Sequence, residues 1–307
     1  MTTLRLGIDI GSTTIKFVVL DENAKIIYKN YERHFSETGN AFKRNLEKVA
    51  PVLGDNPFYI TLSGSSGMGV ASRLNLPFEQ EVLSCTSAIN LLAKDTETAI
   101  ELGGEDAKIT YLKGSLEQRM NGACAGGTGA FIDQMANLLN TDAKGLNDLA
   151  KKGSKLYTIA SRCGVFAKTD IQALINDGAQ KEDLALSIFQ AVVNQTVGTL
   201  AQGRAIEGKT AFLGGPLTFL SELKERFIKT LNLIDEDVVA TPDACYFVAI
   251  GAAICDEAKL TSLKELTELS KTDLNAVTET KNHCEPLFSS RDEYDAFVKR
   301  HSEDIVK

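Results

Sequence analysis

The sequence contains two closely similar stretches, Gly7-Ile8-Asp9-Ile10-Gly11-Ser12-Thr13-Thr14 and Ile100-Glu101-Leu102-Gly103-Gly104-Glu105-Asp106. In each, an apolar strand ends at a carboxylate, a glycine turn follows, and hydroxyl or acidic residues come next. Glycine lets backbone N–H groups approach a phosphate closely, and hydroxyls add further donors. A carboxylate beside such a loop can hold a hydrated Mg²⁺ ion. Two facing loops would therefore bind a nucleoside triphosphate from both sides, although each alone is also compatible with a plain tight turn.

The residues after the two loops repeat one plan. Lys16–Leu20 and Lys25–Tyr31 flank a turn, as do Lys108–Leu112 and Leu116–Met120, so a β-hairpin is expected after each loop. The internal repeat of strand, acidic glycine loop, hairpin and helix predicts an α/β protein with two similar lobes and a cleft between them.

The hydrophobic pattern predicts further elements and approximate lobe boundaries. We expect strands at Leu4–Ile10, Phe58–Leu62, Thr98–Leu102, Thr210–Leu213 and Val238–Val239, and helices at Thr38–Val52, through Val70 and Leu74, and at Gly129–Leu139, Gly164–Ile175, Glu182–Gly203, Leu217–Leu231, Ala244–Ala258 and Leu260–Leu274. The expected division is an N-terminal lobe at residues 1–95, a C-terminal lobe at 96–243, a final helix at 244–260 that packs back on the first lobe, and a C-terminal extension or linker at 261–307.

The bulk composition excludes some classes of protein. The 307 residues carry a net charge of −8, which argues against a nucleic-acid platform. We expect no apolar stretch of the roughly 20 residues that span a bilayer. The N-terminus leads straight into a strand, which is unlike a signal peptide. A cytoplasmic protein without nucleic-acid or membrane partners is expected.

Two smaller features complete the expected nucleotide site. Lys16 lies just past the first loop and could contact a terminal phosphate, or be a solvated strand lysine. Gly214-Gly215-Pro216 stands between a strand and a helix, where a flat glycine turn lets an adenine base lie against the backbone. With the backbone of Gly11, Ser12, Thr13, Thr14, Gly103 and Gly104, these residues form the expected ATP/ADP site.

Two cysteines stand just before predicted helices, in Asn121–Phe131 and in Ser161–Ala167. The amides of Gly127, Thr128 and Gly129 begin the first of these helices and favour anions, and a thiol near such an end is biased toward thiolate. Two thiolates cannot complete a four-coordinate site, but a symmetric dimer would supply four, which suits a 4Fe-4S cluster. The alternative is that Cys124 and Cys163 are buried apolar residues. The other four cysteines are interpreted as structural: Cys85, Cys245, Cys255 and Cys284.

With these motifs, residues Leu4 to about Ala258 resemble the ATPase activators of 2-hydroxyacyl-CoA dehydratases and their relatives in benzoyl-CoA reductase systems. That group belongs to the acetate and sugar kinase, Hsp70 and actin superfamily, whose lobes are duplicated RNase H-like domains. The phosphate loops identify the superfamily, whereas the specific markers are the Asn121–Phe131 segment and Cys163-Gly164-Val165-Phe166-Ala167. The sequence differs from the family pattern at Glu105, where the family usually has glutamine.

The resemblance implies a homodimer with an ATP site in each subunit and one 4Fe-4S cluster per dimer, held by Cys124 and Cys163 of both subunits. ATP hydrolysis would drive an electron from the cluster to a 2-hydroxyacyl-CoA dehydratase-like partner, and a ferredoxin or flavodoxin would supply that electron. The end of the chain resembles the junction in larger fused proteins, so the partner could lie in the same full-length chain.

We assign provisional roles to the acidic residues. Asp9 and Glu101 would hold Mg²⁺ through water, and one of them or Glu105 would orient the attacking water. Two other functions remain open on the same fold: a small-molecule kinase, and a regulatory module that binds nucleotide without hydrolysing it.

Overall fold

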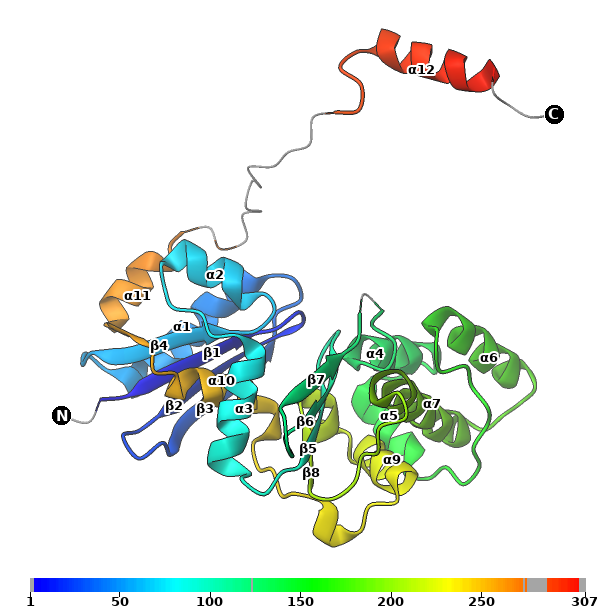
Figure 1. Cartoon of the computed structure of the whole chain (residues 1–307), viewed down its shortest axis with the longest axis horizontal. Helices are drawn as coiled ribbons and strands as arrows, with labels where there is room; N and C mark the ends of the chain where they lie inside the picture. Colours follow the sequence, from blue (N-terminus) through cyan, green and yellow to red (C-terminus); the bar gives the residue numbers. More distant parts are fainter. Residues whose placement is uncertain (1–2, 123, 273, 275–285, 304–307) are drawn as a thin grey trace. The chain divides into compact units, whose positions relative to one another are not determined.

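The computed structural model describes residues 3–122, 124–272, 274 and 286–303 (Figure 1). Ala123 of the first cysteine segment, Cys284 and most of residues 273–285 lie outside the described residues, so the interpretation of Cys284 as structural has no counterpart in the structure.

The N-terminal sheet has the strand order β3-β2-β1-β4-β9. Strand β1 pairs antiparallel with β2 and parallel with β4, and β9 joins the far edge. Its strands are β1 (Arg5–Ile10), β2 (Thr14–Leu20), β3 (Ile26–Arg33), β4 (Phe58–Ser63) and β9 (Lys259–Thr261).

The C-terminal sheet repeats this plan with the order β7-β6-β5-β8. Strand β5 pairs antiparallel with β6 and parallel with β8, as β1 does with β2 and β4. Its strands are β5 (Thr98–Leu102), β6 (Ala107–Tyr111), β7 (Glu117–Met120) and β8 (Thr210–Leu213). The expectation of an α/β chain with a duplicated sheet is confirmed.

Helices cover both sheets. The N-terminal half carries α1 (Thr38–Leu53), α2 (Gly67–Leu74) and α3 (Glu81–Leu92), and the cysteine-bearing half carries α4 (Gly129–Leu138), α5 (Ala143–Ala150), α6 (Gly164–Asn176), α7 (Lys181–Thr196), its π-helical continuation η1 (Val197–Ala201), α8 (Gly215–Phe219) and α9 (Ser221–Leu231). Short turns η2 (Asp235–Asp237) and η3 (Ala244–Tyr246) precede α10 (Phe247–Ile254), and α11 (Leu263–Leu269) and α12 (Arg291–Glu303) follow.

Helices α3 and α10 lie between the two sheets (Figure 1) and form a core cluster with residues of both. The backbones approach so closely that only glycine fits at two contacts. A Cβ atom at Gly7 of β1 would lie 1.9 Å from the carbonyl oxygen of Ala249, and one at Gly251 of α10 would lie 1.7 Å from that of Ser84. The first glycine loop is therefore fixed to the central helices through β1.

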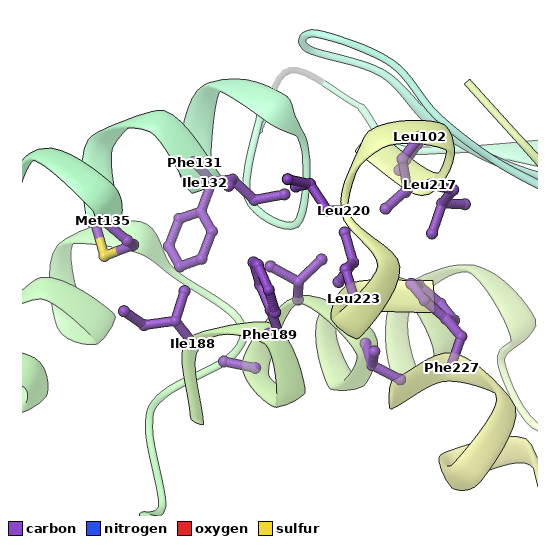
Figure 2. Close-up of a cluster of buried hydrophobic side chains, with 14 of the residues drawn as sticks. Leu102, Phe131, Ile132, Met135, Ile188, Phe189, Leu217, Leu220, Leu223 and Phe227 are labelled. Atoms are coloured by element: carbon purple, nitrogen blue, oxygen red, sulfur yellow. The ribbon is translucent and has the colours of Figure 1, made fainter. Parts of the chain in front are cut away.

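A second core fills the C-terminal lobe, where α4, α7 and the α8–α9 region pack together. In Figure 2, Phe131 and Met135 of α4 lie against Ile188 and Phe189 of α7, and all four are buried. The helix that follows the Cys124 segment is therefore packed on the buried helix α7.

Helix α7 and η1 together span Lys181–Ala201, a length and composition that would suffice to cross a membrane, contrary to the expectation of no such stretch. In this structure 72% of its apolar window is buried inside the protein, as for a core helix.

Several expected elements differ from the structure. Helices α3 and α5 were not expected; α3 carries exposed leucines beside its buried face, which weakens the helical pattern. The expected helix at 217–231 is interrupted at Leu220, and Val238 forms only an isolated bridge with Thr210. The expected helix over 260–274 is instead β9 followed by α11.

The chain divides into the compact unit Met1–Asn275 and a second unit, Ala276–Lys307. This division differs from the expected boundary at residue 260, because β9 extends the N-terminal sheet and Leu266 of α11 is buried in the core of that lobe. In the second unit, Phe288 packs against Tyr294 and Phe297 of α12.

Gly251→Ala should lower the free energy of unfolding by about 2 to 3 kcal/mol, because its methyl group would overlap the carbonyl of Ser84. Urea denaturation measures the change. Gly198→Ala is the control, since a Cβ there would meet no atom within 4 Å. Equal stability of the two variants would contradict the close packing of α10.

Candidate active site

Asp9 is the penultimate residue of β1 and faces Lys16 directly across the β1–β2 pair. The Lys16 ammonium donates to Asp9 Oδ2 at 2.6 Å, and Asp9 is only 2% exposed. The other carboxylate oxygen, Oδ1, is buried without a hydrogen-bond partner among the described residues. A buried charged oxygen without a partner is costly, so this atom is suited to a ligand that supplies a positive charge or donor.

Lys16 is held in its charged form by its surroundings. Burial lowers its pKa, but the Asp9 carboxylate and then Tyr31 outweigh burial and raise the pKa above its ordinary value. The ammonium also lies 5.7 Å from the Tyr31 ring centroid. Lys16 is therefore a fixed cation lining the cleft, not the solvated strand lysine that was the alternative.

The second lobe contains the same pair. Glu101 of β5 faces Lys108 of β6 across the strands, with 3.5 Å between Lys108 Nζ and Glu101 Oε1. Lys108 Nζ also donates to Glu81 Oε1 at 2.7 Å and lies 3.9 Å from Asp106 Oδ2. These three carboxylates outweigh the effect of burial and raise the Lys108 pKa above its ordinary value.

Lys108 is not among the site residues expected from the motifs, although the sequence contains a signal for it. Asp9 precedes Lys16 by seven residues, and Glu101 precedes Lys108 by the same number. Because the β1–β2 and β5–β6 pairs have the same register, this spacing places each lysine opposite its carboxylate.

Glu81, at the start of α3, is a further acidic residue of the cleft that the sequence analysis did not identify. Burial raises its pKa to about 7, and the neighbouring Glu101 carboxylate adds to the rise while Lys108 opposes it. Such a carboxyl group can exchange a proton near neutral pH, a property typical of functional sites.

The two glycine loops have the same kind of backbone turn and contact each other. Gly11 donates to the carbonyl of Thr14 at 2.9 Å, and Gly103 donates to that of Asp106 at 2.7 Å. A Cβ atom at Gly104 would lie 2.2 Å from Thr13 Oγ1. The loops therefore face each other at the cleft, as the repeated sequence predicts.

Most of the expected site residues line this one cleft. They are Asp9, Gly11, Ser12, Thr13, Thr14, Lys16, Glu101, Gly103, Gly104, Gly129, Gly214, Gly215 and Pro216. Gly214 has φ +85°, and a Cβ there would lie 2.1 Å from the carbonyl oxygen of Leu102, so this turn requires glycine. Gly215 approaches Tyr31, because a Cβ at Gly215 would lie 2.6 Å from the Tyr31 hydroxyl oxygen.

Glu105 is not in the cleft, contrary to the expectation of a catalytic role. Its side chain is exposed, whereas Asp106, the next residue, lines the cleft and approaches Lys108. Both residues lie in the turn closed by the Gly103–Asp106 backbone hydrogen bond, and only Asp106 lines the cleft.

Gly127 and Thr128 also do not line the cleft. Thr128 is fully buried and its hydroxyl donates to the Ala125 carbonyl at 2.5 Å. The next two amides donate to the second glycine loop, Gly129 to Gly103 at 3.0 Å and Ala130 to Gly104 at 2.8 Å. The amides of Gly129 and Ala130 are therefore bonded to the loop's carbonyls, and the anion site expected at this helix start stays a prediction.

The two segments with cysteines before helices lie on one lobe, at the starts of α4 and α6. Cys124 is exposed, and its Sγ accepts from the Gly126 amide at 3.4 Å; Cys163 is half-buried. A Cβ at Gly164 would lie 3.5 Å from the Phe131 ring, so the start of α6 packs on α4. The alternative of two buried apolar cysteines does not describe these thiols.

The other described cysteines lie in different surroundings. Cys85 and Cys245 line the cleft, and burial raises the pKa of both thiols, to about 11 for Cys245. Cys255 donates to Glu79 Oε2 at 3.0 Å.

An ion pair also joins the two lobes beside the cleft. Arg33 of β3 contacts Asp133 of α4, and both residues line the cleft. Aromatic residues line it too, with Tyr31 and Phe219 packed edge to face at a centroid distance of 5.3 Å. Sequence analysis missed these residues because they come from separate elements.

The chain matches the BadF/BadG/BcrA/BcrD ATPase family over residues 6–255. It belongs to this family. The match includes both glycine loops and both cysteine segments, so the family and the ATPase activity expected from the resemblance are confirmed.

Two relatives and a solved structure agree with this assignment. The chain is 29% identical over 219 residues to the (R)-2-hydroxyglutaryl-CoA dehydratase activating ATPase of Acidaminococcus fermentans, covering 70% of this chain and 84% of that protein. It is 30% identical over 215 residues to the 2-hydroxyisocaproyl-CoA dehydratase activator of Clostridioides difficile, covering 68% and 80%. The solved activator of the 2-hydroxyisocaproyl-CoA dehydratase from Clostridium difficile with bound ADPNP matches with a TM-score of 0.69 and 23% identity, over 90% of this chain and 98% of that one, and confirms the fold.

Glu81→Gln tests the acidic cluster through pH. The raised pKa means that the folded protein keeps this proton at pH values where the unfolded chain has lost it. The contribution of Glu81 to stability should therefore fall as pH rises from about 4.5 to about 7. Glu81→Gln lacks this contribution, so its stability relative to wild type should increase by roughly 1 to 2 kcal/mol between about pH 5 and pH 8. Urea denaturation in buffer that contains a metal chelator measures the free energy of unfolding of both proteins at each pH. Parallel pH profiles of the two free energies would contradict the prediction.

Proposed function

We propose that this chain is an ATP-dependent activator that delivers an electron to a 2-hydroxyacyl-CoA dehydratase-like partner. The observation that carries the proposal is the direct attachment of the Cys124 segment to a nucleotide loop, since Gly129 and Ala130 donate to Gly103 and Gly104. The names of the relatives, which are activators of such dehydratases, support the choice of partner.

The nucleotide site is proposed from the cleft. Backbone N–H groups of Gly11–Thr14 and Gly103-Gly104 would bind the phosphates, and the Lys16 ammonium would add a positive charge. The glycine turn Gly214-Gly215-Pro216, with Tyr31 beside it, would receive the adenine. The solved relative was determined with bound ADPNP, which supports a nucleotide as the ligand of this fold.

The site suits Mg²⁺ bound through water. Asp9 Oδ1 is buried without a hydrogen-bond partner among the described residues, and Glu101 lies in β5, which leads into the facing loop of the same cleft. Within the part of the chain that the structure describes, no three side chains converge as direct metal ligands, which favours water-mediated contacts. The ion would neutralise charge on the phosphates. Asp9 or Glu101 would orient the attacking water, and Glu81 could accept its proton.

The exposed Cys124 and the half-buried Cys163 fit an iron–sulfur cluster shared between two copies. Cys124 and Cys163 supply two thiols at packed helix starts, and a homodimer would supply the four that a 4Fe-4S cluster needs. When bound, the cluster would carry one electron, which a ferredoxin or flavodoxin would supply. Such chemistry requires a reducing compartment, which supports the cytoplasm.

Asp9→Asn should reduce ATP hydrolysis by about 100-fold or more, because it removes the charged oxygen proposed to hold the metal's water. Measured ADP binding should persist. Glu105→Gln is the control, and its exposed side chain should leave hydrolysis within about twofold of wild type. An unchanged rate in Asp9→Asn would contradict the proposed site, and a phosphorylated small molecule as product would favour a kinase.

Cys124→Ser should abolish cluster binding while nucleotide affinity is retained. Purified anaerobically with iron and sulfide, the wild-type dimer should hold about four iron ions. Cys255→Ser is the matched control, because serine can still donate to Glu79. A colourless wild-type protein that takes up no iron or sulfide would contradict the cluster.

A further inference from the structure

The Asn121 side chain connects the second glycine loop to the Cys124 segment. Its Nδ2 atom donates to the Glu105 carbonyl at 3.0 Å and to the Cys124 carbonyl at 2.8 Å. Its Oδ1 atom accepts from the Ala107 amide at 2.7 Å. The Asn121 side chain therefore bonds to Glu105 and Ala107 at the end of the glycine loop and to the backbone of Cys124.

The far end of the cysteine segment is attached to the same loop. The amides of Gly129 and Ala130 donate to the carbonyls of Gly103 and Gly104. Residues 121–130 are thus held at both ends by residues 103–107. Movement of the loop must either carry the cysteine segment with it or break these hydrogen bonds.

The direction of these bonds explains how a nucleotide could act on them. Three successive carbonyls, of Gly103, Gly104 and Glu105, accept hydrogen bonds from the cysteine segment. In a trans peptide the N–H group points opposite to the carbonyl, and the described chain contains no cis peptide. The N–H groups of the next residues, 104–106, therefore point away from the cysteine segment, and Gly104 lies against Thr13 of the first loop.

We propose that Asn121 is a positioning residue that couples the state of the nucleotide loop to Cys124. The inference rests on the proposed function. A phosphate that binds the N–H groups of these peptides would rotate the peptide planes, and each carbonyl would rotate with its plane. Asn121 bonds to the Glu105 carbonyl and would transmit this rotation to the Cys124 carbonyl. An amide is required, because it offers two donors and one acceptor at a single position.

Asn121→Asp tests the coupling with a side chain of almost the same shape. A carboxylate has no N–H to donate to the two carbonyls, and would meet their oxygens instead. The experiment uses the full chain with reduced, cluster-free thiols. It measures the alkylation rate of Cys124 by peptide mass spectrometry, with and without ADP or a non-hydrolysable ATP analogue plus Mg²⁺.

In the wild type, nucleotide should change the Cys124 rate by at least about fivefold. In Asn121→Asp the change should fall below about twofold, while nucleotide affinity stays within about threefold of wild type. Asn137→Asp, on the exposed face of α4, is the control and should keep the wild-type response. If circular dichroism shows that Asn121→Asp does not fold, Asn121→Ser is used in its place. Serine has a single hydroxyl, which cannot donate to both carbonyls.

The outcomes separate this inference from the proposed function. A wild-type chain that binds no nucleotide would overturn both. A chain that hydrolyses ATP but shows a nucleotide-independent Cys124 rate would overturn only the role of Asn121. So would an Asn121 variant that keeps the full response, or loss of the response in Asn137→Asp.

Discussion

Two lysines face four of the carboxylates that line the cleft, which belong to Asp9, Glu81, Glu101 and Asp106. Lys16 and Lys108 are largely buried, so their attraction to the carboxylates is weakly screened by solvent. Without these ammonium groups, the like charges of the carboxylates would repel one another with little screening. The pairing of β1 with β2 and of β5 with β6 places each lysine opposite its carboxylate. The charge balance therefore depends on the register of these strands, and a slip of one residue would destroy it.

This dependence explains how much of the molecule could be predicted. The paired loops, both hairpins and the cleft between two lobes follow from local patterns that the sequence shows directly. Glu81 and Asp106 could not be placed in the same way. Glu81 enters the cleft because α3 packs on α10, which is a tertiary contact. Asp106 lines the cleft and Glu105 is exposed, although both are acidic neighbours in one turn, and residue type alone does not distinguish them.

The central helices give the first loop a rigid base. Because Gly7 and Gly251 have no side chains, the backbone of α10 lies directly against β1 on one side and α3 on the other. Close-packed interiors transmit displacements and deform little. A nucleotide that draws the two loops together would thus move one lobe relative to the other, with the Arg33–Asp133 ion pair joining β3 to α4 at the cleft.

The cysteine segment therefore lies between a movable part and a fixed one. On one side it is bound to the second glycine loop through Asn121, Gly129 and Ala130. On the other side it meets the buried end of α7, where a Cβ at Gly127 would lie 2.9 Å from Gln195 Cγ. Helix α7 shares the core of this lobe with β5 and β6, the strands that flank the loop, so in the proposed coupling only the peptide planes of the loop turn relative to α7. A shift of the loop then changes the position of Cys124 relative to α7, so the short segment converts a small turn of peptide planes into a displacement at the thiol.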